Sequence, residues 1–187
     1  MGASMTAWAT RLASTELAAV LPRRWAHTRG VASRAVALEG VLRGRSDLLV
    51  AAATLHDVGY APRLAVTGFH PLDGARFLRD EHHADERLTR LVANHSFALL
   101  EAEERGLGEV LVAEFPLLGD PLLVDALVYC DMTTTPDGHR TTAPARIAEI
   151  TGRYGPDSVV GRFIQRAAPE ILASVGRIEA ALAAQPR

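Results

Sequence analysis

The chain has 187 residues, of which 48% are hydrophobic and 22% are charged, and its formal net charge is −2. This length suits one domain with a substantial core, and the composition is that of an ordinary globular protein. The small net charge gives no electrostatic reason to expect nucleic acid or a membrane as a partner. All twenty basic residues are arginines, which excludes lysine Schiff-base chemistry and a Walker-type phosphate loop within this chain.

Cysteine usage and the absence of targeting features both favour a cytoplasmic protein. The single cysteine, Cys130, excludes an internal disulfide and fits a reducing compartment. The sequence contains no signal-peptide pattern and no apolar run of about 18 residues. We therefore expect the protein to be cytoplasmic.

Apolar residues recur at helical spacing along almost the whole chain, and Pro, Gly and capping residues mark the helix ends. The expected helices, in chain order, cover residues 5–20, 22–42, 46–57, 71–81, 84–96, 121–131, 144–154 and 157–184. Pro169 is expected to split the last of these, because proline inside a helix removes a backbone hydrogen bond. Ser46 and Asp47 suit the start of the third helix, whose remaining residues are almost all apolar.

Two segments are less regular. Residues 106–120 include Leu107 to Val112, which could form either a strand or a helical turn. The segment TTTPDGHRTT, after Asp131, has the composition of a loop. The sequence therefore predicts an all-α fold in a single domain over residues 1–187, with a helical C-terminal extension over residues 136–187.

Imidazole and carboxylate groups occur in the order H…HD…H…H…D. The residues concerned are His27, His56, Asp57, His70, His95 and Asp131. The His56-Asp57 pair follows the apolar run from Leu48 to Leu55, and Asp131 ends a second apolar run. Burial of so many ionisable groups is costly unless something pairs with them, and a metal cation fits that role. Neutral imidazole and carboxylate together suit Zn, Fe, Mn or Ni ions.

A single buried histidine is more often a core residue than a metal ligand, so the joint pattern carries the argument. His82, His83 and His139 lie in polar, turn-like surroundings, and we expect them to be solvated. Thr133 to Thr135 follow Asp131 and offer hydroxyl groups near the metal, although threonines in loops more often cap and turn the backbone.

His27, the His56-Asp57 pair and Asp131 resemble the H…HD…D signature of the HD superfamily of metal-dependent phosphohydrolases. The segment TLHDVGYAP also has the apolar approach and the glycine two residues after the aspartate that are typical of this superfamily. The resemblance covers roughly residues 20–135, which would form the metal-binding core. It implies that these four residues ligate one metal ion.

The segments FHPLDGARFL and LVANHS are similar to those of the binuclear branch of the superfamily. In that branch His70 and His95 would hold a second metal, and Asp57 would bridge both ions. The spacing looks closest to that of phosphohydrolases that split diadenosine tetraphosphate, and the di-iron oxygenases of the superfamily share the six-ligand order. The alternative is that His70 only opens a helix and that His95 only caps one.

The chain departs from the family pattern near the HD pair. Many members carry a lysine three residues after the aspartate, where it can touch a substrate phosphate, and here that position is Tyr60. Arg63 is our candidate for this charge, because guanidinium suits bidentate phosphate contact. Arg23 and Arg24 are weaker candidates. The 35 residues between His95 and Asp131 are long for a compact nucleotide hydrolase, and this region, including residues 97–120, could form a substrate lid or a homodimer surface.

The resemblance implies a metal-dependent phosphohydrolase that cleaves a phosphoester or phosphoanhydride of a nucleotide or another small phosphorylated metabolite. Asp57 and His56 would be catalytic, with two divalent ions (Fe, Mn, Ni, Co or Zn) supplying hydroxide as the nucleophile. Two alternatives remain: a di-iron oxygenase with the same ligands, and a non-catalytic sensor that retains the site for ligand binding.

Overall fold

The computed structural model describes residues 4–185, and its regular structure is helical. The α-helices are α1 (Met5–Leu17), α2 (Pro22–Val36), α3 (Glu39–Leu42), α4 (Ser46–Leu55), α5 (His70–Asp80), α6 (Glu86–Ala93), α7 (Ala98–Glu104), α8 (Gly108–Glu114), α9 (Pro121–Met132), α10 (Ala143–Tyr154) and α11 (Val159–Ala183). Two 3₁₀ helices, η1 (Val58–Tyr60) and η2 (His95–Phe97), lie between them. Over the described residues the strand-like pairing is limited to an isolated bridge between Thr134 and Arg140. The predicted all-α fold is confirmed.

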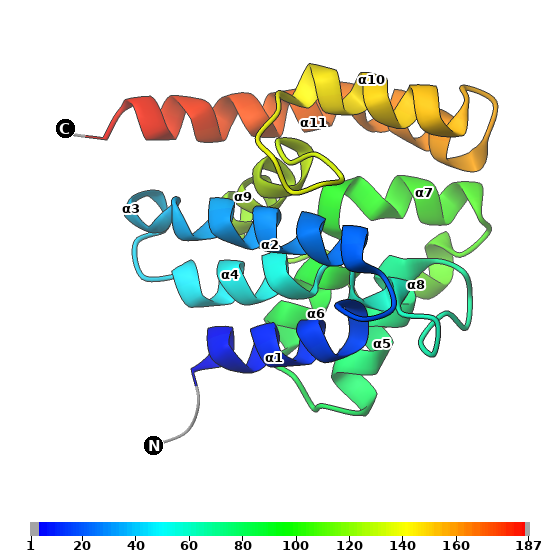
Figure 1. The fold of residues 1–187 in the computed structure, drawn as a ribbon. Helices are drawn as coiled ribbons and strands as arrows, with labels where there is room; N and C mark the ends of the chain where they lie inside the picture. The colour runs from blue at the N-terminus through cyan, green and yellow to red at the C-terminus, as the bar shows by residue number, and fades with distance from the viewer. Residues whose placement is uncertain (1–3, 186–187) are drawn as a thin grey trace.

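Helix α4 lies at the centre of the molecule. Its residues from Leu48 to Leu55 are all buried, as the apolar run predicts. Helices α1 and α2 pack along α4, and α6 and α9 also contact it (Figure 1). A helix that is apolar all round is stable only when neighbours cover every face. The C-terminal end of α4 is therefore buried, and the His56-Asp57 pair directly follows it.

Helices α10 and α11 form a separate layer that covers one side of α9 (Figure 1). Buried side chains between these helices make a second hydrophobic cluster: Val128, Met132, Ala143, Ile150, Phe163, Ile164, Ala167, Ile171 and Val175. A bidentate ion pair joins Arg177 of α11 to Asp125 of α9, with N–O distances of 2.6 and 2.7 Å. Side-chain caps begin both helices: Thr142 Oγ1 accepts a hydrogen bond from Ala145 N, and Ser158 Oγ accepts one from Gly161 N.

Two helix boundaries differ from the sequence prediction. The helix expected over residues 22–42 ends at Val36, and a separate short helix, α3, follows. Ala37 and Leu38 form a turn between the two helices, and Leu38 is buried in the core. Pro169 does not split α11. Because proline has no N–H group, the carbonyl group of Gln165 lacks its helical donor. Pro169 and Gln165 are both exposed, so this carbonyl group can bond to water instead.

The chain between α6 and α9 also differs from prediction. The helix expected over residues 84–96 ends at Ala93, and Ser96 and Phe97 then adopt positive φ angles of 50° and 62°. Residues 98–104 form a helix that the sequence analysis did not identify. Of the two alternatives for Leu107 to Val112, the helix is confirmed, because α8 spans Gly108–Glu114.

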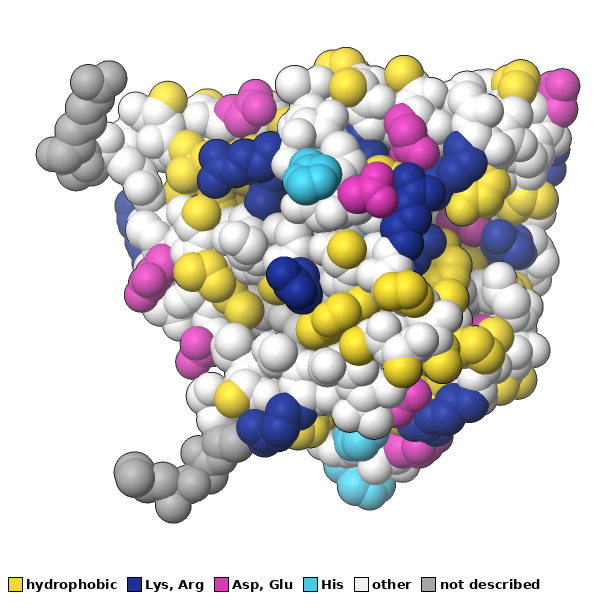
Figure 2. Space-filling view, viewed as in Figure 1, with side chains coloured by type: hydrophobic (Ala, Val, Ile, Leu, Met, Phe, Trp, Pro, Cys, Tyr) yellow, Lys and Arg dark blue, Asp and Glu magenta, His cyan; other side chains and the backbone are white. Residues whose placement is uncertain are grey.

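The face shown in Figure 2 carries basic and acidic side chains interspersed, with hydrophobic side chains in a band between them. Many of the arginines are paired locally; Arg166, for example, lies 2.6 Å from Glu103 and 3.0 Å from Glu104. This face therefore presents no large patch of a single charge. Among residues 4–185 no helix combines the length and the hydropathy needed to cross a membrane.

Candidate metal centre

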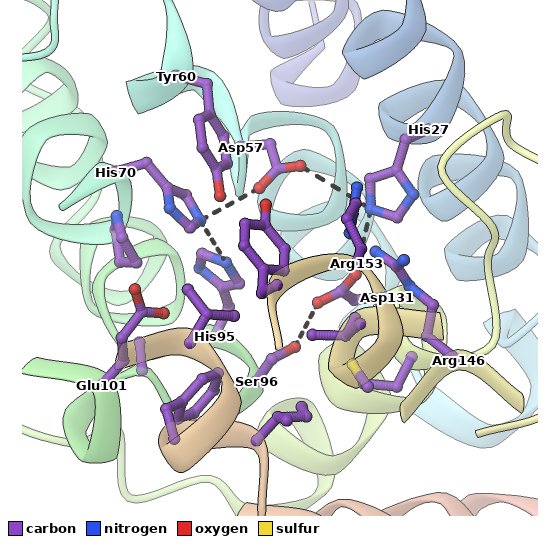
Figure 3. A pocket seen from close by; sticks show the side chains of 18 of the residues that line it. His27, Asp57, Tyr60, His70, His95, Ser96, Glu101, Asp131, Arg146 and Arg153 are labelled. Carbon is purple, nitrogen blue, oxygen red and sulfur yellow. Dashed lines mark hydrogen bonds and ion pairs between the residues drawn. The ribbon is translucent and has the colours of Figure 1, made fainter. Parts of the chain in front are cut away.

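The six predicted ligands come from five separate segments and lie together, and five of them line one pocket (Figure 3). They are His27 in the middle of α2, His56 and Asp57 after α4, His70 at the start of α5, His95 at the start of η2, and Asp131 near the end of α9. Five of these side chains are buried, and His70 is nearly so. A cation bound among so many buried ionisable groups would lower the free energy of the folded state.

Asp57 stands between two groups of ligands. One carboxylate oxygen, Oδ2, lies 3.4 Å from His56 Nε2 and 3.8 Å from His27 Nε2. The other, Oδ1, lies 3.3 Å from His70 Nε2, which is itself 3.2 Å from His95 Nε2. These distances define two sets, His27–His56–Asp57 and Asp57–His70–His95, that could each hold an ion. Asp57 could thus bridge two ions with its two oxygens.

Asp131 completes the first group. Its Oδ1 atom lies 3.1 Å from His27 Nε2 and 4.0 Å from His56 Nε2. Its Oδ2 atom accepts a hydrogen bond of 2.5 Å from Ser96 Oγ. The positive φ angles at Ser96 and Phe97 bring this hydroxyl group to the carboxylate, and unusual backbone of this kind often accompanies a functional site.

Backbone carbonyl groups fix the orientation of three imidazole rings. His27 Nδ1 donates to Thr135 O at 2.9 Å, His56 Nδ1 to Ala53 O at 2.8 Å, and His95 Nδ1 to Val92 O at 2.7 Å. A carbonyl oxygen only accepts, so Nδ1 must carry the proton in each ring. In the neutral rings Nε2 then presents a lone pair to the pocket, which is the usual second-sphere support for a metal-ligating histidine.

This donor set fits a cation. His56 Nε2 is buried and has no hydrogen-bond partner among the described residues. His27 and His56 direct their Nε2 atoms toward carboxylate oxygens, and a cation between these atoms would attract both. Four imidazole nitrogens and two carboxylates suit divalent transition metals.

The protonation states agree with ligation. Burial lowers the pKa of His56 to about 4, although Asp57 and Asp131 favour the charged ring. Burial likewise lowers the pKa of His70 to about 3, although the contact with Asp57 acts to raise it. Burial alone would raise the pKa of Asp57, but Arg24 and His56 hold it well below its usual range. At neutral pH these groups are therefore neutral imidazoles and a carboxylate, the forms that bind metals.

Arg24, a weaker candidate from the sequence, is the arginine next to the HD pair. Its Nη1 atom lies 2.7 Å from Asp57 Oδ2, and its guanidinium group stacks over the Tyr60 ring at 4.0 Å. The Tyr60 ring in turn stacks on His70 at 3.9 Å. Burial raises the pKa of Tyr60, which keeps its hydroxyl group protonated. Arg23 points elsewhere and pairs with exposed Asp137.

Arg63, our sequence candidate for phosphate binding, lies outside the pocket. Its guanidinium group makes two hydrogen bonds to the buried Glu16, at 2.7 and 2.8 Å, and lies over the Phe77 ring. The physical reason is that Glu16 needs a counter-charge where α1 meets the rest of the core. Arg63 is therefore paired with Glu16 away from the pocket, and its contact with a substrate stays a prediction.

The structure also places the remaining histidines and threonines. His82 is half-buried rather than solvated, because its ring packs edge-on against Trp8 and Phe77. His83 and His139 are exposed, as predicted. The hydroxyl groups of Thr133 and Thr134 bond to backbone carbonyls of α9. The backbone carbonyl of the next threonine, rather than a hydroxyl group, supports the site through His27.

The far wall of the pocket was not predicted from the sequence. The cavity has a volume of about 230 Å³ and adjoins five of the six candidate ligands. Its other lining includes Glu101 of α7 and Arg105 directly after it, Arg146, Ile150, Arg153 and Tyr154 of α10, and Val160, Phe163 and Ile164 of α11. Helices α10 and α11 were predicted, but no local signal in the sequence shows that they fold back over a site formed by earlier parts of the chain.

Comparison with known families gives one match: the family described as HD domain matches residues 24–132. The matched region includes all six candidate ligands and ends before α10 and α11. Comparison with curated proteins and with solved structures gave no significant match.

Proposed function

The chain belongs to the HD domain family, and from that membership we propose that it is a metal-dependent phosphohydrolase acting on a small phosphate ester. The family consists mostly of metal-dependent phosphohydrolases. One observation carries the proposal: six candidate ligands, five of them buried, form two groups that share Asp57, next to the guanidinium group of Arg24. Metal ligands beside a fixed cation suit a substrate that carries two negative charges.

Bound divalent ions would act as they do in other hydrolases. They would lower the pKa of a coordinated water toward neutrality and neutralise charge on the phosphate. His27, His56 and Asp131 would hold one ion, His70 and His95 the other, and Asp57 both. In the reaction, the water oxygen forms a bond to phosphorus, the ester P–O bond breaks, and the departing alcohol takes up a proton.

The protein side chains would orient the substrate. Asp57 and Tyr60 hold the guanidinium group of Arg24 at the pocket. In this position it can donate hydrogen bonds to a non-bridging phosphate oxygen. Ser96 orients Asp131 through its short hydrogen bond, and three backbone carbonyls orient the imidazoles. Because these contacts exist before substrate binds, little reorganisation accompanies the reaction.

The test is metal analysis followed by an activity screen. Protein purified without chelator is analysed for its metal content and is then assayed for phosphate release from phosphomonoesters and nucleotides, without oxygen, with Mn, Co or Ni. We expect turnover with at least one ester, and we expect Asp57→Ala to abolish it while circular dichroism shows an unchanged helical fold. Asp137→Asn, at an exposed ion pair away from the ligands, is the matched control and should keep full activity.

Other outcomes would replace this proposal. The same six-ligand order occurs in di-iron oxygenases, so turnover only with reduced iron and with consumption of dioxygen would assign the site to that class. A fully metallated protein that converts no substrate in either assay would favour a ligand-binding sensor. A folded Asp57→Ala variant with wild-type turnover would remove the metal-centred mechanism altogether.

A further inference from the structure

Part of the pocket wall lies outside the HD domain match. Helices α10 and α11 follow the matched residues 24–132, yet they line the cavity that contains the metal ligands. They contribute two kinds of side chain. The basic ones are Arg146 and Arg153, and the apolar or aromatic ones are Ile150, Tyr154, Val160, Phe163 and Ile164. This combination would suit a ligand with an anionic end and an apolar end.

Arg146 is a buried cation with an unused hydrogen-bond donor. Its side chain is 6% exposed, and its Nε atom is buried without a hydrogen-bond partner among residues 4–185. Its guanidinium group is turned toward Asp131 in Figure 3 and bonds to Glu149 through Nη1. A buried N–H group without a partner costs free energy, and a ligand oxygen at this position would remove that cost.

Arg153 lies on the same side of the pocket, two helical turns further along α10. It is half-exposed, lies 3.3 Å from Glu149, and its guanidinium group is 4.8 Å from the centre of the Tyr154 ring. Glu149 thus supplies one negative charge to two arginines, which leaves a net positive charge at this wall. Arg153 also lines a neighbouring cavity together with Arg24 and His27, so it lies at the edge of the metal ligands.

We propose that Arg146 and Arg153 form a phosphate clamp, and that the apolar side chains of α10 and α11 hold the organic group of a compact phosphomonoester. This inference rests on the proposed function and names its substrate class. Guanidinium groups suit phosphate because their fixed N–H groups match its oxygens. The cavity of about 230 Å³ lies below the usual range of roughly 300–1,000 Å³ for drug-sized ligands, which favours a small monoester over a dinucleoside polyphosphate.

Ligand binding without turnover tests the clamp. The full-length, manganese-loaded protein is titrated calorimetrically, under anaerobic conditions, with methylphosphonate and phenylphosphonate, whose C–P bonds resist hydrolysis. Arg153→Ala should weaken the binding of both by roughly ten- to hundredfold, the size expected for a lost charged hydrogen bond. Arg153→Lys should recover part of the loss. Arg140→Ala, at an exposed arginine outside the pocket lining, should bind like wild type.

The aromatic part of the wall gives a second, independent measurement. Phenylphosphonate should bind more tightly than methylphosphonate, and Tyr154→Ala should remove most of that preference. Equal weakening of both ligands would show that Tyr154 acts only through Arg153 and would overturn the assignment of the organic group. Metal analysis of each variant accompanies the titrations, because loss of metal would weaken binding for a different reason.

The result separates the clamp from the hydrolase proposal. Phosphonate binding that depends on Arg153, in a protein without phosphatase activity, would support the clamp and overturn the hydrolase. Phosphatase activity together with unchanged binding in Arg153→Ala would do the reverse. Arg146→Gln is a second variant for the buried position; if it does not fold, the Arg153 variants still decide the question.

Discussion

Asp57 is a buried carboxylate that has a different set of partners at each oxygen. Arg24, His27 and His56 lie near Oδ2, and His70 lies near Oδ1. Of the six candidate ligands, Asp57 alone belongs to both groups. Loss of its charge would therefore leave Arg24 without its counter-ion and both ligand groups incomplete, which is the physical basis of the Asp57→Ala experiment above.

His70 and His95 belong to one ligand group only, so their loss should affect one ion. We expect His95→Ala to lower the metal content from two ions per chain to one, because His27, His56, Asp57 and Asp131 remain. Mass spectrometry of metals in protein dialysed against a saturating buffer measures this directly. His139→Ala, at an exposed histidine, is the matched control and should retain both ions.

The two-ion arrangement would be contradicted by a single ion in the wild-type protein at saturation. It would also be contradicted by a His95→Ala variant that keeps two. Either result would reassign His70 and His95 to structural roles at their helix ends.

At the scale of elements, the approach of α5 to η1 places His70 beside Asp57. Gly59 makes this possible: a Cβ atom at that position would lie 2.1 Å from the His70 carbonyl oxygen and 2.6 Å from Gly74 N. Both neighbours are backbone atoms, so no side-chain rotation could relieve the clash. The glycine two residues after the HD aspartate is therefore a packing requirement for the second ligand group.

Gly59→Ala should push α5 away from η1 and move His70 from Asp57. We expect a loss of roughly 1–3 kcal/mol in the free energy of unfolding, as is usual for overpacking in a core, and a loss of metal from the Asp57–His70–His95 group. Urea denaturation and metal analysis measure the two effects. Gly119→Ala is the control, because that glycine is exposed and a Cβ atom there would meet nothing within 4 Å. Normal metal content in a stable Gly59→Ala protein would refute this role.

Local chemistry explains which elements could be predicted from the sequence. The run before His56 and the Pro121 start of α9 carry their own signals in apolar spacing and helix-start residues, and both helices form as expected. The turn at Ser96 and Phe97 carries no glycine or proline, so the sequence does not reveal it. It is held instead by tertiary contacts, including the hydrogen bond from Ser96 to Asp131.

The same reasoning applies to the arginines of the site. The order of the six ligands in the sequence was enough to predict that they meet, and they do. The sequence favoured Arg63 over Arg24, but the buried Glu16 pairs with Arg63, and Asp57 pairs with Arg24. The position of Arg146 at the pocket depends on how α10 folds back over it. Such choices are made by long-range ion pairing and packing, which spacing along the chain does not show.

At the scale of the whole molecule, the ligands tie together segments that are far apart in the chain. They run from His27 in α2 to Asp131 in α9, so the complete set exists only in the folded protein. A ligand that binds only the folded state stabilises it, by about 2.7 kcal/mol when its free concentration is one hundred times its dissociation constant. Without a cation, the buried donor atoms repel one another. This repulsion should increase the difference in folding stability between metal-loaded and metal-free protein.

Removal of metal should therefore lower the Tm measurably. For a chain of this size, about 1 kcal/mol corresponds to roughly 2–4 °C, so we expect chelation to lower the Tm by roughly 5–10 °C. Differential scanning calorimetry of metal-loaded and chelator-treated protein measures the shift, and re-addition of Mn should reverse it. The Asp57→Ala variant is the internal control, because both of its ligand groups are incomplete and its Tm should respond weakly to either treatment. Equal Tm values for loaded and chelated wild-type protein would mean that the six side chains meet without forming a metal site.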